Sequence, residues 1–247
     1  MEPGELPRLR DQAEILVVHY PTTVFRVGTP GKMRAATWLG PIGMAAAVAA
    51  MGSHGEELRT KYSLEDPVLR VRNKVLTAVR ENPGLQNLRV REDPVTIAGE
   101  DPAELRKVLG SGTVLDFRTA GWGMLYWPMR VETNYRMNYG VVSRLIRLED
   151  AKVLWQGTCT AASAVDAESS PTMEQLEAND GELLKAHVNK VADACAADLA
   201  AQFQGKEIAP PKRAPTGLRW ASRRRRPCRS VLPRARRRSP RDRLDSA

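Results

Sequence analysis

The sequence predicts an α+β domain: an antiparallel sheet of about four or five strands, with helices packed on one face and a long C-terminal helix across it. Apolar residues alternate with period two over residues 113–119, 134–148 and 152–161. The three residues 149–151 are short enough to join the last two segments as an antiparallel hairpin. Near the C-terminus an apolar stripe recurs at helical spacing, and it must pack on the sheet. The stripe is Leu184, Val188, Val191, Cys195, Leu199 and Phe203.

Charge divides the chain into two unlike parts. Residues 206–247 hold 15 Lys or Arg and 3 acidic residues, or +12, so residues 1–205 carry 9 − 12 = −3 of the formal net charge of +9. We therefore expect a flexible N-terminus at 1–12, a single α+β domain at 13–205 and a disordered Arg-rich tail at 206–247.

The first strands and helix of the domain have clear boundary signals. Residues 13–27 predict either one strand or a bent strand pair, interrupted by Pro21. Asp66 and Pro67 are an N-cap and a first-turn proline, and valines then recur at helical spacing until residues 82–84.

A second set of signals covers the middle of the chain. Residues 85–91 predict a short strand, and Asp101, Pro102 and Glu104 open a short helix that reaches Leu109. In the strand at 134–148 the two halves place apolar residues on opposite faces, so we expect a bulge near Gly140.

One segment of the chain is rich in small apolar residues. The Ala- and Gly-rich segment 33–52, whose residues 35–52 are free of charge, predicts either a helix packed on the domain or at an interface, or a membrane-spanning helix.

Ser170 and Pro171 start a helical region, and residues 179–182 predict a break before the final helix.

Cys159 and Cys195 are candidates for a disulfide. Val153, Trp155, Gly157 and Cys159 should share one strand face, and Cys195 lies in the helical stripe that covers it. A bridge predicts an oxidising compartment, whereas the alternative is two separate buried thiols.

Trp122, Tyr126 and Trp127 cluster near Gly and Pro in a chain that is only 5% aromatic. We expect a loop or hairpin here. The rings predict either a contact surface for a partner or glycan, or a cover over one end of the core.

Recognisable catalytic patterns are missing from the sequence. The three histidines, His19, His54 and His187, lie far apart, and no G-x-S-x-G, G-x-G-x-x-G or H-E-x-x-H motif occurs. We expect a non-catalytic protein without a metal or cofactor.

The tail contains the run Arg223, Arg224, Arg225 and Arg226. Such a run predicts binding of nucleic acid or anionic lipid by counterion release. Its Arg, Pro, Ala and Ser composition equally fits a frameshifted end of a GC-rich gene.

Five segments carry a resemblance to a known family: 114–119, 122–123, 135–139, 144–146 and 152–157 with Cys159. They resemble a family of uncharacterised proteobacterial envelope lipoproteins over about residues 13–204. More loosely, the order of elements is similar to lipoproteins that activate peptidoglycan synthases and to the Tol periplasmic N-terminal domain, which is a likeness of fold alone.

The resemblance implies a cell-envelope protein, periplasmic or lipoprotein-like, that binds an unknown protein or cell-wall partner. It also implies a signal peptide and a lipid-bearing cysteine, and neither is found near Met1, so we expect the gene to start upstream. Membrane association would then use the lipid anchor or segment 35–52. The alternative function is an intracellular nucleic-acid-binding protein that uses its tail.

Overall fold

A computed structural model describes residues 14–28, 40–81, 85, 87–127 and 134–205, with side chains except at 40–47. These residues belong to one of two units of the chain, residues 1–214. The predicted N-terminus at 1–12 and tail at 206–247 lie outside the described residues. The elements are β1 (Ile15–His19), β2 (Phe25–Val27), α3 (Gly40–Lys61), α4 (Val68–Arg80), β3 (Leu88–Val90), α5 (Pro102–Leu109), β4 (Thr113–Tyr126), β5 (Tyr135–Arg147), β6 (Lys152–Ala162) and α6 (Met173–Phe203).

The strands form one sheet in the order β3-β1-β4-β5-β6, with β2 paired to the far part of β4. β4, β5 and β6 form an antiparallel meander, whereas β1 is parallel to both of its neighbours and β2 is parallel to β4. The α+β class and the largely antiparallel sheet are confirmed. The β5–β6 hairpin is confirmed as well.

The expected bulge lies one strand away from its predicted place. The register between β4 and β5 shifts between Thr119 and Gly121, which leaves Ala120 as the extra residue opposite Gly140 and Val141. The predicted position along the sheet was right, but the extra residue lies on β4 and not on β5. A bulge increases the local twist of the strand that carries it.

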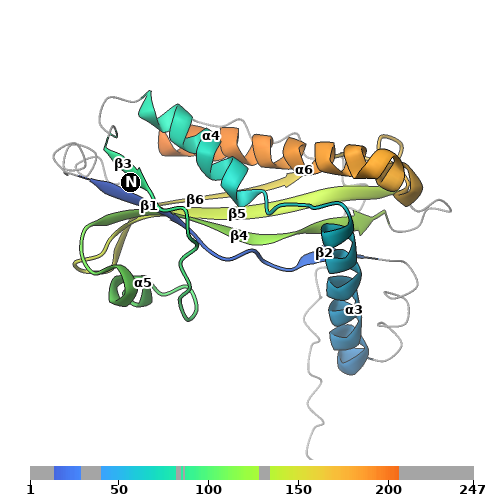
Figure 1. Cartoon of the computed structure of the whole chain (residues 1–247), viewed down its shortest axis with the longest axis horizontal. Helices are drawn as coiled ribbons and strands as arrows, with labels where there is room; N and C mark the ends of the chain where they lie inside the picture. Colours follow the sequence, from blue (N-terminus) through green and yellow to red (C-terminus); the bar gives the residue numbers. More distant parts are fainter. Residues whose placement is uncertain (1–13, 29–39, 82–84, 86, 128–133, 206–247) are drawn as a thin grey trace, which may run out of the picture. The chain divides into compact units, whose positions relative to one another are not determined.

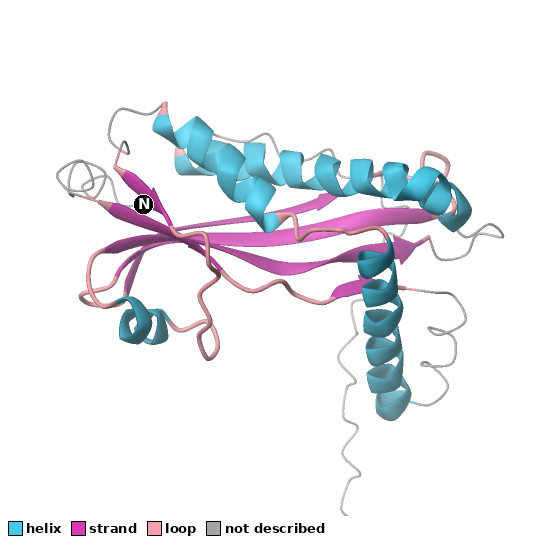
Figure 2. Cartoon of the chain, in the orientation of Figure 1, coloured by secondary structure: helices cyan, strands magenta, loops and turns pink. Residues whose placement is uncertain are grey.

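Helices α4 and α6 lie side by side on one face of the sheet (Figure 1; Figure 2 shows them in cyan above the magenta strands). All six residues of the predicted stripe on α6 are buried in the main core. The ring of Trp155 meets Phe203 edge to face, with centroids 4.8 Å apart. This layer is the long C-terminal helix across the sheet that the sequence predicts.

The short helix α5 packs on the opposite face, at one end of the sheet (Figure 1). Leu105 of α5 joins a second, smaller core with Val18, Val114 and Ile146. The helices therefore cover both faces, and the expectation that they share one face holds for α4 and α6. The Asp101 side chain caps α5 as expected, accepting from the Ala103 N–H at 2.8 Å.

The predicted break in α6 lies at residues 178–181, where Asn179, Asp180 and Gly181 have positive φ. A Cβ on Gly181 would lie 2.6 Å from the Tyr62 ring. The left-handed backbone and this close approach together explain why glycine stands there. Thr172, rather than Ser170, caps the start of α6.

Helix α3 runs away from the sheet beside β2 (Figure 1). It meets β2 at Gly55, where a Cβ would lie 1.9 Å from the Phe25 carbonyl oxygen. Among the helices that the structure describes, none combines the length and the apolar run that crossing a bilayer requires.

Candidate functional site

The predicted aromatic segment is the second half of β4, which pairs antiparallel with the next strand β5, so of the two predicted alternatives the hairpin is correct and the loop is not. β4 continues through Tyr126 because Gly121 and Gly123 fit a twisted strand that pairs with β5 and β2. The Trp122 side chain is only 4% exposed. Its ring lies 4.6 Å from Phe25, and its Nε1 donates to the Thr23 carbonyl oxygen at 2.9 Å. Trp122 therefore belongs to the core, which corrects its assignment as a contact residue.

Tyr126 and Trp127 are partly exposed at the end of β4. Trp127 donates from Nε1 to Ser170 Oγ at 2.7 Å, and the Arg136 guanidinium stacks 4.3 Å from its ring centroid. The neighbouring Leu125 is 41% exposed. We call Leu125, Tyr126, Trp127 and Arg136 the aromatic end. Contact of Tyr126 and Trp127 with a partner stays a prediction.

Cys159 and Cys195 form a disulfide, as the sequence predicts, with their Cα atoms 5.4 Å apart. It joins β6 to α6 inside the main core. Val153 does not share this face, since Leu154 is the extra residue of a bulge between Val153 and Trp155. The Arg223, Arg224, Arg225 and Arg226 run lies outside the described residues, so the nucleic-acid alternative stays a prediction.

A groove lined by titratable groups with shifted pKa values lies where β1 ends. After His19 the chain leaves the sheet and returns five residues later as β2, opening a space between that segment, the end of α3 and the start of α4. The space, which we call the β1 pocket, has a volume of about 550 Å³. Its lining includes His19, Arg59, Ser63, Glu65 and Asp66.

Asp66 forms the floor of the β1 pocket and is 7% exposed. Its Oδ1 accepts from the Val68 N–H at 2.9 Å and from Thr119 Oγ1 at 2.6 Å. Its Oδ2 is buried without a hydrogen bond to any described group. The Thr23 N–H also favours the charged form. Burial raises the pKa of Asp66 above its ordinary value, although these donors oppose the shift.

His19 and Arg72 lie at the same end of the sheet. Arg72 is 4% exposed, and its Nη1 lies 3.4 Å from His19 Nδ1. The same Nη1 donates to the Arg91 carbonyl oxygen, and Nη2 donates to Glu92 at 3.1 Å. Burial, and then the charge of Arg72, lower the pKa of His19. A neutral imidazole that accepts from the guanidinium fits this arrangement.

Sequence reasoning missed this pocket. Asp66 was assigned a cap of α4, which it also is, and His19 was one of three scattered histidines. The signal for the pocket in the sequence was the acidic residue directly before α4. The first turn of this helix packs on the sheet. What the sequence does not show is the hydroxyl of Thr119, 53 residues away, that meets Asp66.

A second polar network lies on the α5 side of the sheet. Arg144 donates to Asp116 at 2.6 Å, and Tyr20 OH donates to the same carboxylate at 2.8 Å. Arg144 Nη1 also donates to the Glu100 carbonyl oxygen at 2.8 Å. Every charged group here has a partner, which indicates that the network joins β1, β4 and β5 rather than awaiting a ligand.

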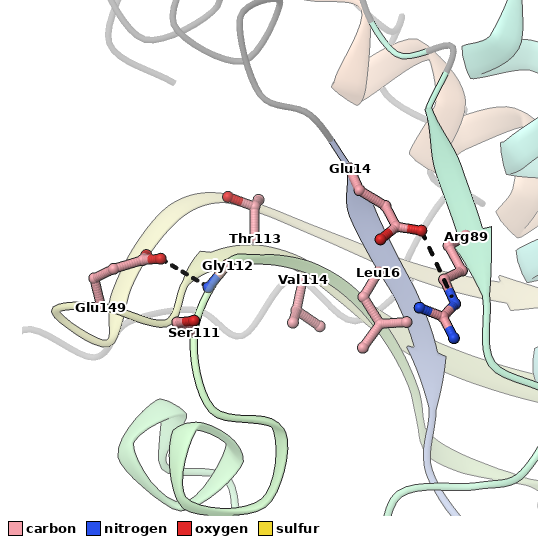
Figure 3. A pocket seen from close by; sticks show the side chains of 8 residues that line it. All are labelled: Glu14, Leu16, Arg89, Ser111, Gly112, Thr113, Val114 and Glu149. Atoms are coloured by element: carbon pink, nitrogen blue, oxygen red, sulfur yellow. Dashed lines mark hydrogen bonds and ion pairs between the residues drawn. The ribbon is translucent and has the colours of Figure 1, made fainter.

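Another hollow of about 490 Å³ lies at the opposite end of β1 and β4 (Figure 3). Its charged side chains bind within the protein: Glu149 accepts from the Gly112 N–H at 2.7 Å, and Glu14 lies 3.9 Å from Arg89. These groups point along the rim instead of converging. Over the described residues, no cluster of His, Cys, Asp or Glu has the arrangement to hold a metal ion.

Comparison with known proteins gives a likeness of structure only. No family model matches the chain, and no curated protein matches it. A hypothetical protein of Chlamydia trachomatis matches with a TM-score of 0.35 and 8% identity, over 78% of this chain and 97% of that one.

Bacterial lipoproteins are among the similar structures. One from Neisseria meningitidis has a TM-score of 0.24 and 17% identity, over 73% of this chain and 99% of that one. A putative lipoprotein of Caulobacter crescentus has a TM-score of 0.28 and 14% identity, over 61% and 98%. At these scores the likeness carries no argument about what this chain does.

Proposed function

We propose that this chain is a non-catalytic accessory protein of the bacterial cell envelope, which acts by binding a protein or cell-wall partner. The Cys159–Cys195 disulfide is the observation that carries the proposal. Structural disulfides form and persist in oxidising compartments and are rare where glutathione and thioredoxin keep thiols reduced. The bridge is buried between the sheet and α6, so it is part of the folded core and not a surface redox switch.

The exposed side chains of the domain suit binding better than chemistry. The aromatic end combines an exposed aliphatic residue, Leu125, with two partly exposed rings and the guanidinium of Arg136. Aromatic and arginine side chains dominate the binding energy of many interfaces. In the β1 pocket Asp66 Oδ1 is occupied by two donors and its Oδ2 is buried, so this carboxylate is held within the fold instead of facing solvent.

The compartment is tested by counting thiols. If the bridge forms in the cell, then in denaturant the unreduced protein from the envelope fraction should have 3 − 2 = 1 reactive thiol, and after reduction it should have 3. The C159A/C195A variant, which keeps a single thiol in both states, is the control. Three reactive thiols before reduction, or recovery of the native protein only with the cytoplasm, would overturn the proposal.

The contact is tested by site-specific photo-crosslinking in intact cells. A photoreactive residue in place of Leu125 should capture a partner, because that side chain stands beside Trp127 on the exposed surface. The same residue in place of Val108, which is 52% exposed on α5 at the other end of β4, is the matched control. Equal capture from both positions, or none from Leu125, would remove the aromatic end as the contact.

A further inference from the structure

The two edges of the sheet differ in their protection against pairing with another strand. β3 is three residues long, contains Arg89, and leads directly into Arg91, Glu92 and Asp93. Short, charged edges prevent association between sheets. β6 is eleven residues long, and no charged residue occurs from Val153 to Val165. In the described part of the chain, nothing but β5 pairs with β6.

The outward-facing backbone groups of β6 are identified by Gln202 of α6. Its side-chain amide accepts from the Thr158 N–H at 3.2 Å and donates to the Thr158 carbonyl oxygen at 2.8 Å. The Thr158 groups therefore point away from β5. Because hydrogen-bonded and non-bonded pairs alternate along an antiparallel ladder, the N–H groups of Gln156 and Thr160 also point outward. No described group accepts from them.

We propose that this edge pairs with the β6 strand of a second copy of the chain, antiparallel about a two-fold axis at or next to Thr158. In this pairing Gln156, Thr158 and Thr160 of one copy lie opposite the same three residues of the other. No like charges meet, and Thr residues on facing strands are favourable neighbours. A charged peptide would find no charged residue on this edge to pair with. Two copies of the edge, in contrast, match each other in backbone donors and acceptors.

Gln202 holds the position that the second strand would take. A primary amide has the same donor and acceptor as a peptide group, so the Gln202 side chain satisfies Thr158 in the single copy and must swing aside when two copies pair. A strand pair alone buries less surface than a permanent interface. The dimer should therefore form at high concentration and dissociate on dilution.

The test is sedimentation of the disulfide-bonded full chain from micromolar to near-millimolar concentration. The T158K and T158E variants should each weaken dimerisation by about tenfold or more, since like charges then meet at the axis. An equimolar mixture of the two should restore a dimer. V108K, which adds the same charge on α5 at a residue 52% exposed, should associate as the wild type does.

Backbone variants address the hydrogen bonds themselves. T160P removes one outward donor without touching the β5 ladder and should weaken the dimer, while T160V keeps that donor and should not. Q202A removes the competing amide and should strengthen association by roughly tenfold.

Two results would overturn the proposal. One is a dimer that survives T158K, T158E and T160P, because it must then use another surface. The other is a monomer at every concentration. Hydrogen exchange at Gln156 and Thr160 then shows whether the edge is left for a different protein or is covered by another segment of this chain.

Discussion

Thr119 on β4 donates a 2.6 Å hydrogen bond to Oδ1 of Asp66, and this bond joins the sheet to the first turn of α4. Tyr139 OH lies 3.4 Å from the same threonine oxygen, which places three polar side chains in a row within the core. The other carboxyl oxygen of Asp66 has no hydrogen bond among the described groups. Asp66 is thus both a helix cap and a buried acid with hydrogen bonds to one of its two carboxyl oxygens among the described groups.

The D66N variant should alter how stability depends on pH. Burial raises the pKa of Asp66 in the folded state. Its contribution is therefore fully present below the unfolded pKa of about 3.9 and is lost as pH rises through the folded pKa. Relative to the wild type, D66N should gain unfolding free energy over that window. Urea denaturation at a series of pH values measures the difference.

The T119V variant tests the same interaction from the other partner, because it removes the hydroxyl that donates to Asp66 and keeps the shape of the side chain. Leaving the buried carboxylate with one donor fewer should cost about 1–3 kcal/mol at neutral pH, and less in acid. A constant difference between D66N and the wild type from acid to neutral pH would contradict the assignment of Asp66.

His187 should produce a slope of the opposite sign. Its Nδ1 lies 2.7 Å from Ser163 Oγ, and burial, followed by the charge of Lys190, lowers its pKa. Since the unfolded chain takes up the proton more readily, stability is lost as pH falls below about 6.5. H187Q should flatten the loss that the wild type shows between neutral and mildly acidic pH. An unchanged slope would mean that His187 titrates alike in both states.

Removing Arg144 alone should be costly. R144M leaves Asp116 buried without its charged partner, and breaking such a pair typically costs about 3–5 kcal/mol. The double variant D116N/R144M should recover part of that loss, because no unpaired charge remains. A double-mutant cycle in denaturant gives the coupling, and a double variant that merely sums the single losses would show the two side chains to be independent.

G157A should destabilise the protein through packing. A Cβ there would lie 2.6 Å from the Trp155 ring and 2.9 Å from Leu199, so these packed side chains must shift. We expect a loss of about 1–3 kcal/mol. G121A is the matched control, since its Cβ meets nothing within 4 Å in another strand of the same sheet. Equal thermal shifts for the two variants would contradict the close contact at Gly157.

Reducing the disulfide should lower the free energy of unfolding by about 3–4 kcal/mol, because the bridge closes a loop in the unfolded chain. The sequence separation of its two cysteines is 36 residues. Guanidinium denaturation with and without reductant measures the loss. C159A/C195A should unfold at the same point in both conditions.

Patterns within one segment predicted much of this fold. The stripe of α6 identified its buried face, and the same stripe brought Cys195 opposite Cys159. The cap at Asp101 and the left-handed backbone at residues 179–181 are set by local sequence, which explains why both were predicted.

Relations between distant segments were not predicted. Trp122 looked like a loop residue because glycines surround it, yet one of them, Gly123, lies so close to β2 that a Cβ would be 2.1 Å from the Arg26 carbonyl oxygen. Val153 was assigned to the wrong face because a single extra residue, Leu154, reverses the alternation. The β1 pocket depends on α3, α4 and β4 meeting at one strand end, which no local period encodes.

The first strand of the domain pairs with partners that are synthesised much later. Ile15 aligns with Leu88 and Thr113, which lie 88 − 15 = 73 and 113 − 15 = 98 positions further along the chain. The centre of the sheet therefore cannot close on a ribosome until both have emerged, and such distant pairings slow folding. Until then the first strand of a nascent polypeptide stays without its sheet partners, and an unpaired strand passes through a narrow pore more easily than a folded sheet.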